Sequence, residues 1–190
     1  MPGPDEPGRA GGRTGCGLAF DDLLTQGMIC LVGIDVTRDP VVVRAGTADG
    51  VPLGSSGRAR LKLYNQPAGD PGYALVEGSH PAGEPRIRDH VHARHEETFL
   101  VLEGEYQVRL GEKVAVAGAG DYVFVPRGTP HSYRNVGPGP ARVLNIMSPA
   151  DGVELLVELG ALAGATVSEE VLKVVHGRHF AVLVDPLPDW

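Results

Sequence analysis

The sequence predicts an all-β domain, a barrel or sandwich of short antiparallel strands, followed by two C-terminal helices. Between residues 58 and 149, apolar segments of strand length recur at close, regular spacing and are separated by turns rich in Gly and Pro. After Pro149 the hydrophobic pattern changes from the period of a strand to that of an amphipathic helix. A chain of 190 residues suits one such domain with a hydrophobic core and terminal extensions.

The N-terminal part is expected to contain a tail and a few strands outside the main domain. Residues 1–17 are rich in Gly, Pro and Arg with little to bury, so we expect a disordered tail. Residues 18–57 are expected to form strands at 28–36 and 40–44, followed by a loop over 46–57.

Residues 58–149 contain the predicted barrel. Its first strand, Arg58 to Asn65, alternates so that Leu61 and Leu63 face the core and Tyr64 faces solvent. The further strands are predicted at residues 73–79, 89–92, 97–103, 105–110, 113–116, 121–125, 131–136 and 141–147.

Residues 150–190 form a predicted helical segment that packs on the barrel. Its first helix, residues 152–163, is expected to bury Leu156 and to expose Glu154 and Glu158, which are four residues apart.

A second helix is predicted from Ser168 to Gly177, because a Ser side chain accepts from the free N–H groups of a first turn and Gly favours a helix end. His176 and His179 lie near that end, where positive charge favours the helix dipole, and no metal role is expected for them. Phe180 to Val184 is expected to add an edge strand.

Composition excludes several classes of protein. A net charge of −7 argues against nucleic acid as a partner, because nucleic-acid-binding surfaces are basic. No apolar run approaches the roughly 18 residues of a membrane span, and the first residues lack a secretory pattern, so no membrane partner is expected. Cys16 and Cys30 make no disulfide framework, which favours a reduced, cytoplasmic setting.

One stretch of the chain contains the residue types of a metal site. His90 and His92 are two apart, so both side chains point to the same face of a strand. Glu97 and His131 complete an inventory of three imidazoles and one carboxylate. This set suits a divalent transition metal such as Fe, Mn, Ni or Co, with Zn also possible.

Two spaced patterns connect these residues to a known family. The pattern G-x5-H-x-H-x4-E-x6-G has its His, Glu and final Gly in place, whereas its opening Gly falls at Glu84 and the nearest glycine, Gly83, is one position earlier. The pattern G-x5-P-x-G-x2-H-x3-N is matched at every position. The matching residues are His90, His92, Glu97 and Gly104, and Gly120, Pro126, Gly128, His131 and Asn135. The chain thus resembles the cupin superfamily in its single-domain form.

Within that superfamily, the segments HEETFLVLEGE and GDYVFVPRGTPHSYRN resemble the quercetin 2,3-dioxygenase-like members. The resemblance implies a double-stranded β-helix, or jelly-roll barrel, with metal bound by His90, His92, Glu97 and His131. It also implies that the N-terminal strands cross to a partner subunit and make a homodimer, with pairing inside their own barrel as the open alternative. It implies a dioxygenase acting on a small hydroxylated aromatic or enol substrate, flavonol- or polyketide-like, with Glu97 also accepting a substrate proton. Two alternatives stay open: a non-redox metal-dependent cyclase or isomerase, and a protein that binds a small molecule without turnover.

Several neighbouring side chains are expected to line a substrate pocket. Phe99 and Val101 share the strand face of Glu97 and would form an apolar wall. Tyr133 shares the face of His131 and would either hydrogen-bond substrate, as a catalytic residue, or pack in the core. Arg88 would either hold an anion at the pocket mouth or lie in solvent.

Other polar residues near the motif are expected to stay outside the metal site. The family spacing selects Glu97 over Glu96, and His95 lies in the turn before it, so both are expected at the rim. His80 ends a strand before a Pro-Ala-Gly turn and is expected to be exposed.

Overall fold

The structure is a computed structural model that describes residues 52–53, 59–66, 69–84, 86–162 and 165–186. All of these residues belong to the compact unit Asp35–Trp190. The predicted tail and the predicted strands at 28–36 and 40–44 lie outside the described residues. None of the helices in the described ranges has the length and hydropathy of a membrane-spanning segment.

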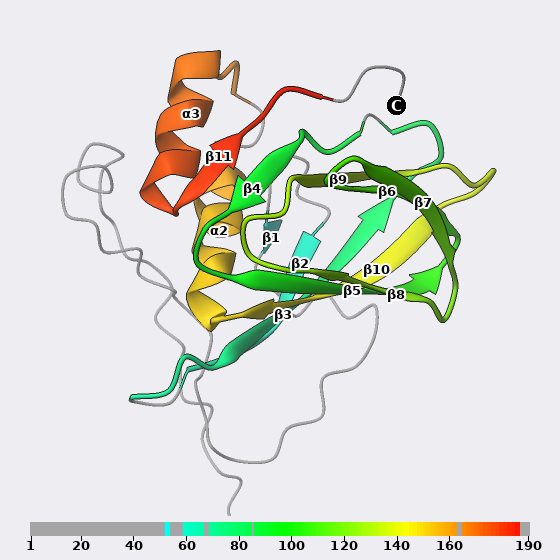
Figure 1. Ribbon diagram of the computed structural model, residues 1–190, viewed down its shortest axis with the longest axis horizontal. Coiled ribbons are helices and arrows are strands. Elements are labelled where there is room, and N and C mark those ends of the chain that lie inside the picture. Colours follow the sequence, from blue (N-terminus) through cyan, green and yellow to red (C-terminus); the bar gives the residue numbers. More distant parts are fainter. Residues whose placement is uncertain (1–51, 54–58, 67–68, 85, 163–164, 187–190) are drawn as a thin grey trace, which may run out of the picture. The chain divides into compact units, whose positions relative to one another are not determined.

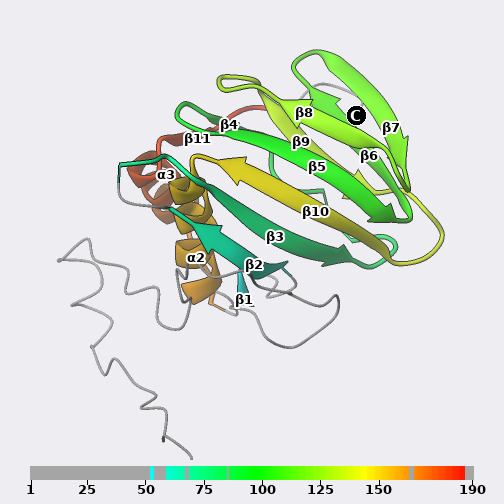
Figure 2. The same cartoon turned by 90° about the horizontal axis from the view of Figure 1, so that it is seen from below.

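The described chain forms two antiparallel sheets, which confirms the predicted all-β class (Figures 1 and 2). The first sheet has the order β1 (Pro52–Leu53), β2 (Ala59–Asn65), β3 (Tyr73–His80), β10 (Ala141–Ser148), β5 (Glu96–Glu103) and β8 (Tyr122–Val125). The second has the order β11 (Ala181–Leu183), β4 (His90–His92), β9 (His131–Asn135), β6 (Glu105–Leu110) and β7 (Lys113–Gly118). From β4 onward the chain passes repeatedly between the two sheets, so residues close in sequence face each other across the core.

Alternating side chains from both sheets meet in one apolar core. Along β5, Glu97, Phe99 and Val101 are buried and the residues between them are half-buried, as the period of a strand requires. The buried core cluster consists of Phe99, Val101, Tyr106, Val108, Ala117, Val125, Ala141 and Val143. Glu97 therefore belongs to a row of buried side chains, and its carboxylate is held at one end of the core.

Two residues of the sequence patterns have structural roles. Gly104, between β5 and β6, has a φ of +79°, and a Cβ there would lie 2.6 Å from the Cβ of Ala141, so only Gly fits. The side-chain amide of Asn135 donates to the carbonyls of His80 (2.9 Å) and Gly139 (2.8 Å), and its oxygen accepts from the Gly137 N–H at 2.9 Å. Asn135 thereby fixes the connection from β9 to β10.

Two predictions for the first strands were wrong. Pro52 and Leu53, expected within a loop, form the short strand β1, which pairs with β2. Tyr64, expected to face solvent, is buried. The pairing of β2 with β3 shifts register between Leu61 and Leu63, and an irregularity of this kind reverses the inward and outward positions that follow.

The C-terminal segment begins with a 3-10 turn, η1 (Ala150–Val153), which leads into the helices α2 (Glu154–Ala161) and α3 (Glu169–Arg178). The two helices lie at one end of the sheets, with α3 beside β11 (Figures 1 and 2). Ser168 caps α3 as predicted, because its hydroxyl accepts from the Val171 N–H at 3.3 Å. Leu155 of α2 packs with Val175 and Ala181 in a second, smaller apolar cluster.

The helix faces and one helix end differ from the prediction. Leu155 is buried, whereas Leu156, the expected core residue, is only half-buried. Glu158, expected in solvent, accepts from Arg178 and contacts His179, both at 2.7 Å, and so ties α2 to α3. Gly177 does not end α3, which continues through Arg178.

Candidate metal centre

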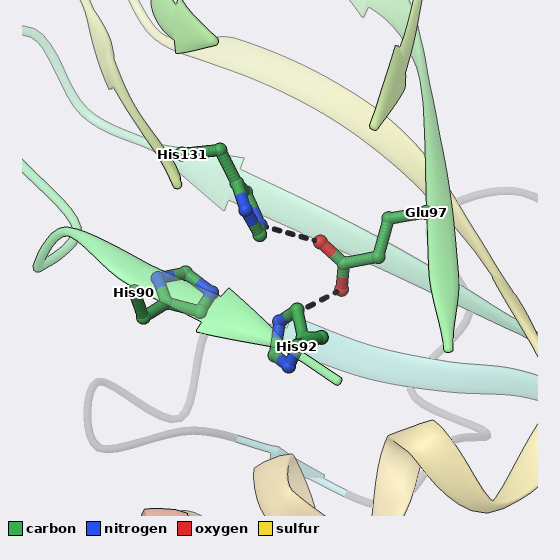
Figure 3. A group of neighbouring side chains, drawn as sticks. All are labelled: His90, His92, Glu97 and His131. Atoms are coloured by element: carbon green, nitrogen blue, oxygen red, sulfur yellow. Dashed lines mark hydrogen bonds and ion pairs between the residues drawn. The ribbon is translucent and has the colours of Figure 1, made fainter. Parts of the chain in front are cut away.

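Four side chains from three strands meet at one point between the sheets. His90 and His92 come from β4, and His131 of β9 pairs directly opposite His90. Glu97 reaches them from β5 in the other sheet (Figure 3). Each of the four offers one ligand atom, and these atoms all lie within 4.8 Å of one another. The sequence therefore predicted correctly which residues come together.

Backbone carbonyls orient two of the imidazoles. His90 Nδ1 lies 2.7 Å from the carbonyl oxygen of Arg88, and His131 Nδ1 lies 2.9 Å from that of Thr129, two residues earlier in each case. A carbonyl oxygen only accepts, so both Nδ1 atoms carry the proton. Each Nε2 therefore points toward the centre of the cluster. This is the usual arrangement of a His ligand whose other ring nitrogen is hydrogen-bonded.

The carboxylate of Glu97 is held at both oxygens. Its Oε2 lies 3.1 Å from His131 Nε2, and its Oε1 accepts from the side-chain amide of Asn145 at 3.1 Å. His92 Nε2 is 3.8 Å from the same Oε1 (Figure 3). Asn145 is a site residue that was not predicted, and its only signal in the sequence is a polar residue at an inward position of the strand at 141–147.

Burial and pairing set opposite protonation states within the cluster. Burial disfavours the charge of Glu97, but the hydrogen bond from His131 and the neighbouring imidazoles outweigh it and hold the pKa of Glu97 well below its usual range. Burial also disfavours charge on His131, yet the bond to Glu97 raises the His131 pKa. These two residues form a buried pair in which the ionised carboxylate favours a protonated His131.

The other two imidazoles are held neutral. Burial, reinforced by the charge of His131, lowers the pKa of His90 to about 4. Burial lowers the pKa of His92 to about 2, against the attraction of Glu97. Neutral imidazoles and an ionised carboxylate are the forms in which these side chains bind metal.

The four residues fit a divalent metal ion. Transition-metal bonds to N and O of about 2.0–2.2 Å place ligand atoms roughly 3–4.4 Å apart, so separations of up to 4.8 Å close with small movements. Both ring nitrogens of His92 are buried without a hydrogen-bond partner among the described residues. Such buried polar atoms are costly unless something binds them, and a metal ion would use one of them.

His90, His92 and Glu97 of the cluster lie in the wall of a cavity of about 420 Å³. Side chains of both sheets line it, including Phe99 and Met147 of the first sheet and Tyr133 of the second, and the helices contribute Leu156, Leu159 and Leu172. The C-terminal helices thus cover the site and supply much of its apolar wall. A volume in this range suits a small-molecule ligand.

Of the four residues predicted to line a substrate pocket, three border the cavity and one lies in the core. Phe99 and Tyr133 line the cavity, and burial raises the pKa of the Tyr133 phenol, which therefore stays protonated. Arg88 also borders the cavity, but its guanidinium makes two hydrogen bonds to the Glu169 carboxylate of α3, at 2.7 and 2.9 Å. Val101 lies in the apolar core cluster.

Two histidines expected at the surface are not there. His95, expected at the rim, is only 3% exposed, and its Nε2 lies 3.9 Å from Glu97 Oε1. His80 is half-buried, with Nδ1 2.8 Å from the Tyr106 hydroxyl. Glu96 is at the rim as predicted, partly exposed and 3.8 Å from Arg127.

His176 does not carry the positive charge expected at the end of α3. It is buried at the cavity wall, and burial lowers its pKa, so the imidazole stays neutral.

Comparison with known proteins agrees with this geometry. Residues 78–147 match the family model described as "Cupin domain". The chain contains a cupin domain. That match includes the four candidate ligands and both sequence patterns, so the resemblance seen in the motifs is confirmed.

Half of the chain is distantly homologous to quercetin 2,3-dioxygenase of Bacillus subtilis, with 33% identity over 95 residues, which cover 50% of this chain and 27% of that enzyme. The chain spans between about a quarter and just over half of the length of the curated relatives it matches, 27%, 38% and 56%. Among solved structures, TT1209 from Thermus thermophilus is 32% identical (TM-score 0.39), with 40% of this cupin chain and 72% of that one covered. A double-stranded β-helix protein from Klebsiella pneumoniae is 24% identical (TM-score 0.44), covering 60% of this chain and 91% of that one.

Proposed function

We propose that this cupin protein is a metal-dependent dioxygenase that acts on a small hydroxylated aromatic or enol substrate. The observation that carries the proposal is the cluster of three imidazoles and one carboxylate, of which His90, His92 and Glu97 lie in the wall of a cavity lined mainly by apolar side chains. The distant homology to quercetin 2,3-dioxygenase over half of the chain supports the same reaction class.

His90, His92, Glu97 and His131 would hold one divalent ion, for which Fe, Mn, Ni and Co are the candidates that suit N and O ligands, with Zn also possible. Such an ion supplies Lewis-acid chemistry and, when redox-active, one-electron chemistry toward dioxygen. The carbonyls of Arg88 and Thr129 keep two of the imidazoles in the tautomer that presents Nε2.

The residues of the chain prepare the substrate. Glu97 would accept the proton of a substrate hydroxyl, against its lowered pKa in the metal-free site, and the Asn145 amide keeps its carboxylate in place. The protonated phenol of Tyr133 can donate to a second substrate oxygen. Phe99, Met147 and the leucines of α2 would bind the hydrocarbon part and exclude water.

Oxygen consumption tests the proposal. The wild-type protein, loaded in turn with Fe(II), Mn(II), Co(II) and Ni(II), is offered hydroxylated aromatics and enols in an oxygen electrode. We expect at least one substrate to drive oxygen uptake. Glu97→Gln, which removes the base but keeps the shape, should lower the rate by about 10²–10⁴-fold. Glu96→Gln is the matched control, because this adjacent carboxylate lies at the rim, and its rate should equal that of the wild type.

The same panel of substrates, repeated without oxygen, shows whether the dioxygenase proposal is wrong. Conversion at an equal rate in the absence of oxygen would reject the dioxygenase and leave a Lewis-acid cyclase or isomerase. Tight binding of a ligand without any conversion would leave a small-molecule-binding protein.

A further inference from the structure

The three candidate imidazole ligands are not held in the same way. His90 and His131 are each fixed by a hydrogen bond from Nδ1 to a backbone carbonyl. His92 has no such bond, since neither of its buried ring nitrogens has a partner among the described residues. Something other than a hydrogen bond must fix the ring of His92.

Three imidazole rings pack against His92, and the ring of His95 lies nearer to it than those of His90 and His131. The rings of His92 and His95 lie with their centroids 3.9 Å apart and their planes inclined by 37°. His95 is itself 3% exposed, and its Nε2, which is buried without a hydrogen-bond partner among the described residues, lies 3.9 Å from Glu97 Oε1. A movement of less than about 1 Å would make this contact a hydrogen bond.

The ring of His95 is held from behind by the turn that begins the helical segment. A Cβ on Gly152 of η1 would lie 2.7 Å from His95 Cγ and 2.9 Å from its Cδ2 and Nδ1. Ring atoms of a buried side chain have no room to withdraw, so a residue larger than Gly would push His95 toward His92 and Glu97. Gly152, His95 and His92 thus form three successive layers.

We propose that His95 is a positioning residue of the metal site. Its ring sets the orientation of the His92 ring and approaches Oε1 of Glu97, the same carboxylate oxygen that Asn145 contacts. This inference rests on the proposed metal site. His95 acts through His92 and Glu97 and is not itself a ligand, and the bare Cα of Gly152 sets its depth.

Metal affinity, measured by calorimetric titration of the metal-free proteins with Co(II), tests the role. The variants are His95→Ala, His95→Phe and Gly152→Ala. Loss of a residue that orients a metal ligand typically weakens binding about 10–100-fold, and we expect this for His95→Ala and Gly152→Ala. His95→Phe restores a ring against His92, so it should bind more tightly than His95→Ala. It also fills the same space, and the test therefore does not depend on the Ala variant folding.

The control is His80→Asn, which alters another half-buried imidazole of the same cavity that contacts Tyr106 and Tyr133. Its affinity should match that of the wild type. If folded Gly152→Ala, and His95→Ala where it folds, bind Co(II) as tightly as the wild type, His95 does not position the site. If the wild type itself binds no Co(II), the metal site of the proposed function fails instead.

A count of coordinated imidazoles separates positioning from ligation. Pulsed electron paramagnetic resonance of the Cu(II)-loaded wild type should report three imidazoles, and His95→Phe should report the same three with weaker binding. Four imidazoles in the wild type, falling to three in His95→Phe, would make His95 a ligand and overturn the inference.

Discussion

His131 and Glu97 show how individual residues prepare the site for a cation. In this buried pair the Glu97 carboxylate favours a proton on His131 Nε2, at the position where the ligand atoms converge. A divalent ion would replace the proton on His131 Nε2 and leave the Nδ1 bond to Thr129 unchanged. The proton on His131 therefore competes with a metal ion for the site.

Acid should destabilise the metal-free protein through His90 and His92. In the unfolded chain a His titrates near about pH 6.5, whereas burial holds the folded pKa of His90 at about 4 and that of His92 at about 2. Between these values the unfolded chain binds more protons, so the free energy of unfolding should fall as the pH drops below about 6.5. His131, whose folded pKa is raised, stabilises the fold below its unfolded pKa, and this contribution is lost as the pH rises through the folded pKa.

Urea unfolding of the metal-free protein between pH 7 and pH 4.5 measures this slope. His92→Leu removes one buried titrating group and should flatten the slope by up to about 1.4 kcal/mol per pH unit. Equal slopes for the two proteins would show that His92 is not held neutral by burial.

At the scale of elements, the sequence predicted what depends on local pattern. The strands, the buried row Glu97, Phe99 and Val101, and the Ser168 cap all follow from spacing of a few residues. The burial of His95 could not be predicted, because it depends on Gly152, which comes much later in the chain, after the last strand of the barrel. The burial of Tyr64 depends on a register shift in β2 for which the alternating sequence gave no signal.

The helix α2 should contribute to stability through Leu155. This side chain is 3% exposed and packs with Val175 and Ala181. Leu155→Ala should lower the free energy of unfolding by about 2–5 kcal/mol, as expected for a large-to-small change in a core. On α3, Val174 is 54% exposed, so Val174→Ala should change the free energy of unfolding by less than about 0.5 kcal/mol. Similar values for the two variants, from urea titrations, would mean that α2 does not pack as described.

At the scale of the whole domain, the metal site connects the two sheets. His90, His92 and His131 belong to one sheet and Glu97 to the other, and the chain crosses between the sheets within the turn of residues 93–95. An ion held by all four would bind only the folded arrangement. Its binding free energy would then add to the stability of the domain.

Thermal unfolding should therefore respond to metal. At an ion concentration of about 100 times the Kd, binding adds about 2.7 kcal/mol, which for a chain of this size raises the Tm by about 5–10 °C. Mn(II) should raise the Tm of the wild type, and a chelator should reverse the change. His131→Ala should show neither effect, and an equal rise in this variant would place the binding elsewhere.

The central claim is that His90, His92, Glu97 and His131 hold one metal ion, and anomalous X-ray scattering from crystals soaked in Mn(II) tests it most directly. The expected result is one anomalous difference peak per chain, in contact with Nε2 of His90, Nε2 of His131, a ring nitrogen of His92 and the carboxylate of Glu97. A fully soaked crystal with no peak between these four side chains, or with its ion bound elsewhere, would contradict the claim.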